Sequence, residues 1–267
     1  DLHRRRHSFP TRRSSDLWIA NEDTIIFDVN FNVELDIELI SNYSKLIFSC
    51  YKLNEKLNEK LFQDYTNNDF NYLYVGSDFN QNVSNLPQSL TLINFGSDFN
   101  QDVSSLPPFI THLFFGFRFN QDVSALSPNL THLTFGDYFN QDVSVLPSFL
   151  THLIFGTCFN QDISNLPLTL THLTLGYYFM KECNVLPNIK YLKLNCNNPY
   201  IINFLPNSVA ELELNSNFDL EINNLPTSIK KLVINKHSRY DVDLNCLPDF
   251  IKELHLNKSY KKRILNI

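Results

Sequence analysis

The sequence lacks the features that usually mark membrane proteins, disulfide-rich proteins and metal-binding clusters. Its 267 residues contain no uninterrupted apolar run near the roughly 18 residues that cross a bilayer, and the five cysteines form no C-x-x-C pair. We therefore expect no membrane contact, no cofactor or metal, and reduced thiols in an intracellular, cytoplasmic protein. Only 6 glycines and 12 prolines are present, which excludes collagen and Gly/Pro-rich low complexity. Hydrophobic residues make up 43% of the chain, enough to bury a sizeable core.

Positive charge is scarce outside the first residues. Residues 1–17 hold five of the eight arginines and a net charge of +3, which leaves −9 for the remainder of a chain with a total of −6. The string SFPTRRSSDL resembles a translated sequencing adapter, so we interpret residues 1–17 as non-native or disordered. A basic targeting arm is the alternative, but no apolar signal-peptide core follows it. The acidic remainder has no basic stripe, which argues against nucleic-acid binding.

An internal repeat of 20 residues dominates the sequence. Each of the six glycines is followed three residues later by phenylalanine, and a fixed period of this size indicates a solenoid. The repeat reads L-T-H-L-x-F-G-x-x-F-N-Q-D-V-S-x-L-P and is nearly unbroken over residues 130–148. Beyond residue 180 the Gly and FNQ are lost, while the Leu-Pro pairs and apolar triplets continue. The glycines are Gly76, Gly96, Gly116, Gly136, Gly156 and Gly176.

Each repeat contains the x-L-x-L-x alternation of a short strand, then a turn and a Pro-containing extended return. Twenty residues cannot hold a strand, a full α-helix and two loops, so we expect an extended or 3₁₀ convex side. The predicted fold is mainly β, a single-sheet parallel β-solenoid of leucine-rich-repeat type. Residues 70–257 should form this solenoid, and residues 258–267 a C-terminal tail. Ten strands should begin near residues 70, 90, 110, 130, 150, 170, 189, 209, 229 and 251.

The repeat also predicts which residues stack between neighbouring turns. Leu133, Phe135, Phe139, Val143 and Leu146 of one repeat should lie against their counterparts 20 residues later, because no repeat can cover its apolar face alone. The glycine should supply a permissive turn conformation. The Asn that follows each Phe should form a ladder that satisfies backbone groups at the strand exit, and the repeated Asp should be a turn residue.

The motif F-N-Q-D-V-S-x-L-P followed by L-T-H-L-x-F-G resembles the FNIP repeat, a relative of leucine-rich repeats abundant in social amoebae and in large DNA viruses that infect amoebae. Five units over residues 76–179 retain FNQ, and residues 180–257 match more loosely. The resemblance implies a protein-interaction surface, often joined to an F-box-like N-terminus in the viral proteins, and no catalytic residues.

Residues 18–69 precede the repeats. Leu46, Cys50, Leu53, Leu57 and Leu61 have the spacing of an amphipathic helix, and a shorter helix is expected around residues 37–43. The direct interpretation is a short α-helical N-terminal cap that shields the first strand. Residues 44–54 also resemble the distal half of an F-box, so a truncated F-box remnant that binds a cullin-ligase linker subunit is the alternative.

The face of the sheet opposite the core is the predicted site for a protein partner. One column on this face is histidine, and a second column is partly apolar where solvent is expected, although a tolerant solvated ladder is the rival explanation. A flat row of imidazoles does not converge on a tetrahedral metal, and no nucleophile lies beside it. The candidate partner-binding residues are His112, Phe114, His132, Thr134, His152, Ile154, His172, Thr174 and Tyr191.

These observations predict a monomeric, non-enzymatic protein-interaction solenoid. A narrower hypothesis is the substrate receptor of a cullin-type ubiquitin ligase. The alternative is a structural or genome-expanded repeat protein without a fixed ligand.

Overall fold

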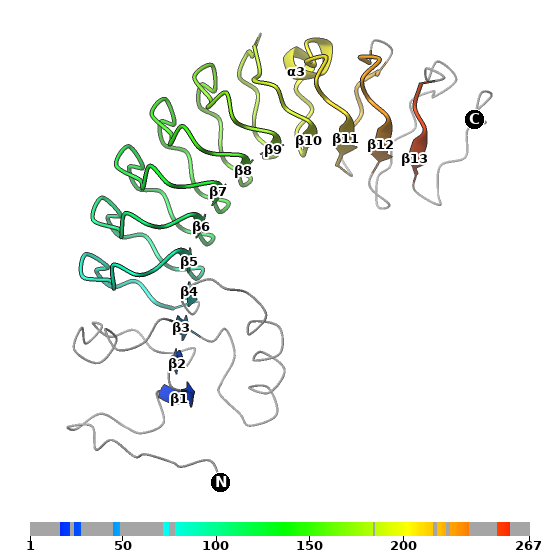
Figure 1. The fold of residues 1–267 in the computed structure, drawn as a ribbon. Coiled ribbons are helices and arrows are strands. Elements are labelled where there is room, and N and C mark those ends of the chain that lie inside the picture. Colours follow the sequence, from blue (N-terminus) through cyan, green and yellow to red (C-terminus); the bar gives the residue numbers. More distant parts are fainter. Residues whose placement is uncertain are drawn as a thin grey trace.

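The computed structural model describes residues 17–21, 24–27, 45–48, 72–74, 78–183, 185–215, 218–222, 225–234 and 250–256. Thirteen strands in these segments form one sheet whose spatial order is the order of the sequence. The strands β1 and β2 pair antiparallel, and all later pairs are parallel. Figure 1 shows the strands along the inner side of an arc and the turns and extended returns along its outer side.

Short strands recur at the period set by the sequence. The first three are β1 (Leu17–Asn21), β2 (Thr24–Phe27) and β3 (Lys45–Phe48). The solenoid strands are β4 (Tyr72–Tyr74), β5 (Leu92–Asn94), β6 (His112–Phe114), β7 (His132–Thr134), β8 (His152–Ile154), β9 (His172–Leu175), β10 (Tyr191–Leu194), β11 (Glu211–Leu214), β12 (Lys231–Ile234) and β13 (Glu253–His255). These last ten confirm the ten predicted strands and the single-sheet parallel solenoid.

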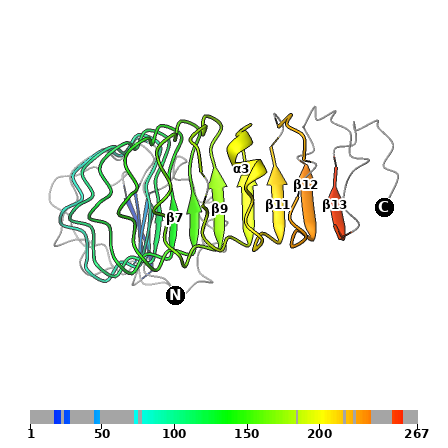
Figure 2. The ribbon, with the colours of Figure 1, turned by 90° about the horizontal axis from the view of Figure 1, so that it is seen from above.

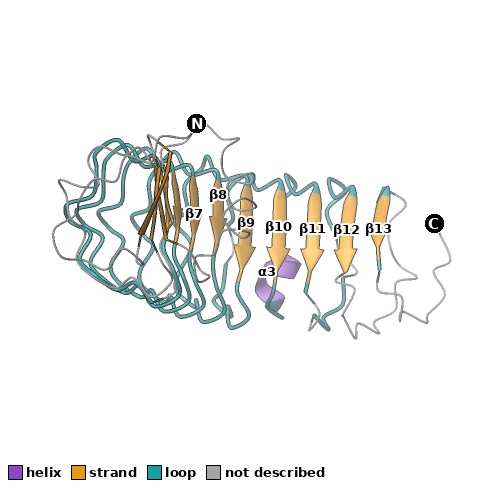
Figure 3. Ribbon diagram, turned by 90° about the horizontal axis from the view of Figure 1, so that it is seen from below, coloured by secondary structure: helices purple, strands orange, loops and turns teal. Residues whose placement is uncertain are grey.

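The convex side is built from turns and extended chain, as the repeat length predicts. Seen from below, the later strands lie side by side in one row (Figure 3), and the view from above shows the same row from its convex side (Figure 2). Among the described residues the exception is the five-residue helix α3 (Pro199–Asn203), between β10 and β11. The side-chain oxygen of Asn198 caps it by accepting a hydrogen bond from the Tyr200 amide at 2.9 Å.

Two phenylalanines per repeat form the centre of the core. Phe135 and Phe139 stack with ring centroids 3.7 Å apart, and Phe139 lies between Phe119 and Phe159 at 6.1 and 6.0 Å. The Phe139 ring is 0% exposed. The predicted buried columns are therefore confirmed, except that Leu146 is only partly buried. Each ring depends on the repeats on both sides for its packing.

A ladder of side-chain amides joins the turns, also as predicted. The Asn140 backbone N–H donates to Oδ1 of Asn120 at 2.9 Å, and Nε2 of Gln141 donates to the same Oδ1 at 3.1 Å. The same pattern links each FNQ repeat to the one before it. In the following turn, Oδ1 of Asp142 accepts from the Ser144 amide at 2.9 Å, which confirms the repeated Asp as a turn residue.

The glycine column has a different cause from the one predicted. None of Gly116, Gly136, Gly156 and Gly176 has the left-handed backbone conformation that favours glycine. A Cβ on Gly136 would instead lie 1.8 Å from the Gly116 carbonyl oxygen. Glycine is needed here because successive turns approach too closely for any side chain.

The N-terminal region departs from the predicted helical cap. The sheet continues through β3, which pairs with β2 and β4, so three strands precede the predicted start of the sheet near residue 70. The predicted helix begins at Leu46, but Lys45–Phe48 is a strand, because pairing to the sheet overrides the helical spacing. The remainder of that helix, the helix expected around residues 37–43, residues 1–16 and the tail 258–267 lie outside the described residues.

Candidate functional site

Four histidines form a continuous stack on the inner face of the sheet. Strand register aligns His112, His132, His152 and His172, and successive ring centroids are 4.2, 4.1 and 4.0 Å apart. The Tyr191 ring extends this row, with its centroid 5.6 Å from that of His172. The structure therefore brings five of the predicted site residues into one column, and we call its four histidines the histidine stack.

A threonine before each histidine fixes the orientation of its ring. The Thr131 Oγ1 lies 2.9 Å from Nδ1 of His132 and 3.1 Å from the carbonyl oxygen of Thr111. The same two contacts recur at Thr111, Thr151 and Thr171. The repeat motif T-H is thus a positioning device that sequence reasoning missed, although the conserved spacing of Thr and His within the repeat could have indicated it.

Stacking keeps the inner imidazoles uncharged at neutral pH. Burial, and to a lesser extent the charges that neighbouring imidazoles would carry, lower the pKa of His132 and His152 to about 4. The pKa of His112 is lowered for the same reasons. The stack therefore presents neutral rings rather than cations at pH 7.

The apolar column lies beside the histidine stack. Register aligns Phe114, Thr134, Ile154 and Thr174, and Ile154 is 42% exposed while Phe114 and Thr134 are half-buried. Thr174 differs from the prediction, because it is only 8% exposed. The accessible part of this column is therefore centred on β6 to β8.

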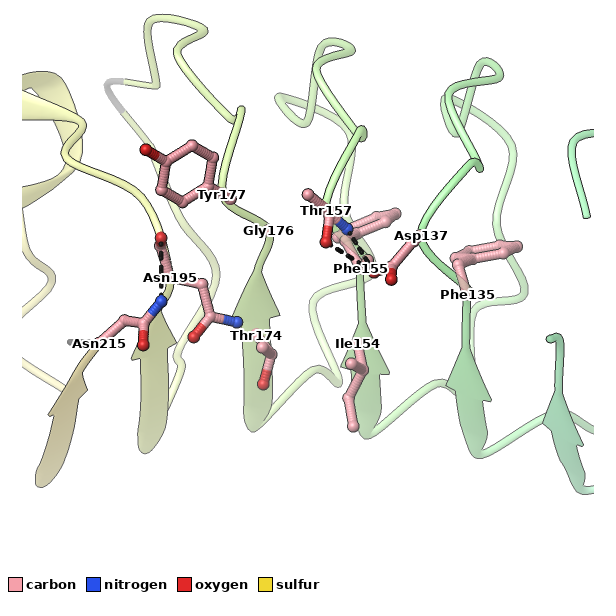
Figure 4. Close-up of a pocket in the computed structure, with 11 residues that line it drawn as sticks. Phe135, Asp137, Ile154, Phe155, Thr157, Thr174, Gly176, Tyr177, Asn195 and Asn215 are labelled. Carbon is pink, nitrogen blue, oxygen red and sulfur yellow. Dashed lines mark hydrogen bonds between the residues drawn. The ribbon is translucent and has the colours of Figure 1, made fainter. Parts of the chain in front are cut away.

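A hollow of about 560 Å³ opens at the C-terminal ends of the strands, next to Ile154 (Figure 4). Gly156 and Gly176 line it together with Asn195, which follows β10 at the position that Gly176 occupies after β9. Asn195 therefore carries a side chain at a position where the preceding turns have glycine. Tyr177 and Thr174 also line the hollow. Sequence reasoning did not identify this hollow.

The inner face changes character beyond β9. The Tyr191 hydroxyl donates to Oε2 of Glu213 at 2.6 Å, and Lys193 pairs with Oε1 of the same carboxylate at 2.7 Å. Lys231 pairs with Glu211 at 2.7 Å. Burial raises the pKa of Glu213, but the hydrogen bonds from Lys193 and Tyr191 outweigh it and leave the pKa lowered. These charges are already matched within the sheet.

Two exposed phenylalanines follow the Leu-Pro turns. Phe109 and Phe149 are 60% and 61% exposed, but the intervening repeat carries Asn129 at this position. They are therefore isolated side chains rather than a continuous column, and single exposed apolar residues are common on proteins.

The described residues do not form a metal-binding cluster. No cluster of three or more His, Cys, Asp or Glu is arranged to hold a metal ion in the part of the chain that the structure describes. Cys158, Cys183 and Cys196 are free thiols, and burial raises the pKa of Cys183 and Cys196, which makes them less reactive. Within the described segments, no helix has the length and apolar composition of a membrane span.

Comparison with known proteins agrees with the geometry. A search of curated proteins finds no match. The chain is similar to the crystal structure of CroV588, described as a novel circular LRR protein, with 30% sequence identity and a TM-score of 0.71. The alignment covers 93% of this chain and 36% of that one, so the chain spans about a third of that protein's length. The FNIP Repeat family model matches residues 79–118, 119–158, 142–178, 184–217 and 197–237, more than half of the chain. The chain belongs to the FNIP repeat family.

Proposed function

We propose that this FNIP repeat protein binds a protein partner, and that the inner face over β6 to β9 is its binding surface. Repeat solenoids provide extended inner surfaces on which one column of side chains after another contacts a partner. The proposal concerns the histidine stack together with Phe114 and Ile154.

The observation that carries the proposal is the contrast between the two halves of this face. Over β6 to β9 the face presents neutral imidazoles and partly exposed apolar groups. Over β10 to β12 the polar side chains bond to one another, since Glu213 accepts from the Tyr191 hydroxyl and pairs with Lys193. Uncharged groups lose little on desolvation, so the first half suits contact with a partner better than the second.

The rival role is a structural repeat protein without a fixed ligand. A purely structural sheet requires polar or charged side chains on its solvent face, as the Lys and Glu pairs over β10 to β12 provide. Ile154, at 42% exposure, and the half-buried Phe114 do not fit that pattern. The rival role predicts that removing them leaves every interaction of the protein unchanged.

The narrower adaptor role depends on residues 18–69. Residues 44–54 resemble the distal half of an F-box, and such a segment would bind the linker subunit of a cullin ligase. Lys45–Phe48 is a strand of the sheet, which gives this role no support, and residues 49–69 lie outside the described residues. Copurification of the full chain with a purified linker subunit would support it, whereas failure to bind at micromolar concentration would exclude it.

The test of the proposed surface uses a protein captured by the wild-type chain from a eukaryotic lysate and then purified. A variant with His132→Ala, His152→Ala and Phe114→Ser should lose binding at least tenfold while it keeps the circular dichroism spectrum of the wild type. A control with Phe109→Ser and Phe149→Ser removes the exposed aromatic side chains that follow the Leu-Pro turns and should bind normally. Unchanged affinity of the triple variant would exclude the inner face as the site.

A further inference from the structure

We propose that the histidine stack is held in one tautomer, with the proton on Nε2, and that its row of N–H donors binds the backbone carbonyl oxygens of a proline-rich segment. This inference rests on the proposed function for the location of the surface. It adds that the surface presents hydrogen-bond donors, and it names the chemical class of the ligand.

The tautomer follows from the hydrogen bonds around each threonine carbonyl. The Thr111 carbonyl oxygen accepts from the backbone N–H of Thr131 at 2.9 Å and from that of His132 at 3.0 Å. A carbonyl oxygen has two lone pairs, so these two donors already occupy it. The Thr131 hydroxyl would be a third donor to that oxygen, at 3.1 Å, whereas Nδ1 of His132 is closer, at 2.9 Å.

The hydroxyl therefore donates to Nδ1, which must be unprotonated to accept. A neutral imidazole with a bare Nδ1 carries its proton on Nε2. The same is true of His152. The Thr131 carbonyl oxygen already accepts the backbone N–H groups of Thr151 and His152, at 2.9 and 3.0 Å, so the Thr151 hydroxyl donates to Nδ1 of His152. Among the residues that the structure describes, Nε2 of His132 and Nε2 of His152 have no hydrogen-bond partner.

Nε2 of His132 and Nε2 of His152 thus offer hydrogen-bond donors, while their Nδ1 atoms are already engaged by the threonine hydroxyls. The ligand must supply acceptors, and an uncharged stack in an acidic protein favours neutral carbonyl oxygens over carboxylates or phosphates. Phe114 and Ile154, in the neighbouring column, add apolar contact area.

A proline-rich segment combines these properties. In the polyproline II conformation its carbonyl oxygens have no internal hydrogen bonds, its prolines have no N–H groups that need acceptors, and its rings are apolar. The conformation also exists before binding, so little chain entropy is lost. A β-strand ligand fits less well, because its N–H groups would face a surface of donors.

Nitrogen-15 NMR of the histidine side chains tests the tautomer in the free protein. At pH 7 we expect the signals of His132 and His152 to show a bare Nδ1 and a protonated Nε2. Thr131→Val and Thr151→Val remove the hydroxyl donors and should shift the adjacent imidazole toward a tautomer mixture. Thr91→Val is the matched control, because Leu92 rather than histidine follows it. A protonated Nδ1 in the wild type would overturn the inference and leave the proposed surface untouched.

Peptide binding tests the ligand class. We expect a fluorescent decaproline peptide to bind the wild type at least tenfold more tightly than a decamer of alternating glycine and serine, which has as many carbonyl groups. Affinity for decaproline should fall at least fivefold in the double variant Thr131→Val, Thr151→Val and stay unchanged in Thr91→Val. Equal binding of the two peptides, or no binding of decaproline, would overturn the inference. In either case the captured partner's response to the triple variant still decides the proposed function.

Discussion

His132 and His152 stack with their ring centroids 4.1 Å apart, and neither can be protonated without placing a charge against the other. Burial is the main reason that the pKa of both lies at about 4, and the repulsion between neighbouring imidazoles adds to it. The repeat places a titratable group at the same point in four successive turns, and this makes a chemically uniform neutral row.

The first prediction is that acid weakens both partner binding and fold stability, over a pH range set by the pKa values of His132 and His152. Their pKa of about 4 in the folded chain lies below the ordinary 6.5 that applies after unfolding. The unfolded chain therefore takes up protons first, so the stability is complete above pH 6.5 and is lost progressively as the pH falls through 4. Urea unfolding between pH 7 and pH 4 should show a smaller decline in His132→Gln, His152→Gln than in the wild type.

Partner binding should persist at pH 5 and fall as the pH approaches 4, when the stack becomes charged. On the same face, the Glu213 carboxylate accepts from the Tyr191 hydroxyl and pairs with Lys193, so its charge is already matched. A loss of affinity centred near pH 6.5 would mean that the imidazoles titrate like exposed histidines.

The second prediction concerns the phenylalanine core. Phe139→Ala should lower the free energy of unfolding by about 3 to 5 kcal/mol, because the ring is fully buried between two repeats and its cavity cannot collapse easily. Val145→Ala in the same repeat, at a side chain 64% exposed, should change it by less than about 0.5 kcal/mol. Chemical denaturation measures both. A loss below about 1 kcal/mol for Phe139→Ala would be inconsistent with the ring's position in the core.

The third prediction concerns the close approach of the turns. Gly136→Ala should lower the free energy of unfolding by about 1 to 3 kcal/mol, because its Cβ would meet the Gly116 carbonyl oxygen at 1.8 Å. Asn195→Ala is the control in the same column, where a Cβ already exists, and should be tolerated. Thermal unfolding of the two variants compares them. Equal stability would show that the turns are more widely spaced than described.

The fourth prediction concerns a buried hydroxyl. The Ser228 Oγ is buried and has no hydrogen-bond partner among the described residues, so Ser228→Ala should raise the free energy of unfolding by about 1 kcal/mol. Ser124→Ala removes a hydroxyl that donates to Asp122 at 2.8 Å and should lower it instead. If Ser228→Ala is destabilising, this hydroxyl has a partner outside the described residues.

The sequence predicted those parts of the fold that depend on the repeat alone. A period of 20 residues fixes which residues face each other across the sheet, so the Phe139 column and the Asn120 ladder followed from spacing. The region before the repeats has no such period. The spacing that begins at Leu46 was therefore interpreted as a helix, although Lys45–Phe48 pairs with strands on both sides.

The site was predicted only in part for a similar reason. Strand alternation placed His132 and Ile154 on one face, but alternation does not report depth, so the burial of Thr174 was missed. The recurring Thr-His pair is visible in the sequence, but the 2.9 Å contact between Thr131 and His132 also depends on the side-chain geometry of each turn. The hollow beside Asn195 is lined by residues of several repeats, and a recess of this kind becomes visible only in three dimensions.

The most direct test of the binding surface is hydroxyl-radical footprinting of the wild-type chain, free and bound to the captured partner, because it reports side-chain access without any substitution. If the inner face is the binding surface, the partner should protect His132, His152, Phe114 and Ile154. The labelling of Phe109 and Phe149 should stay unchanged. Protection confined to Phe109 and Phe149, with the histidine stack labelled as in the free chain, would contradict binding at the inner face.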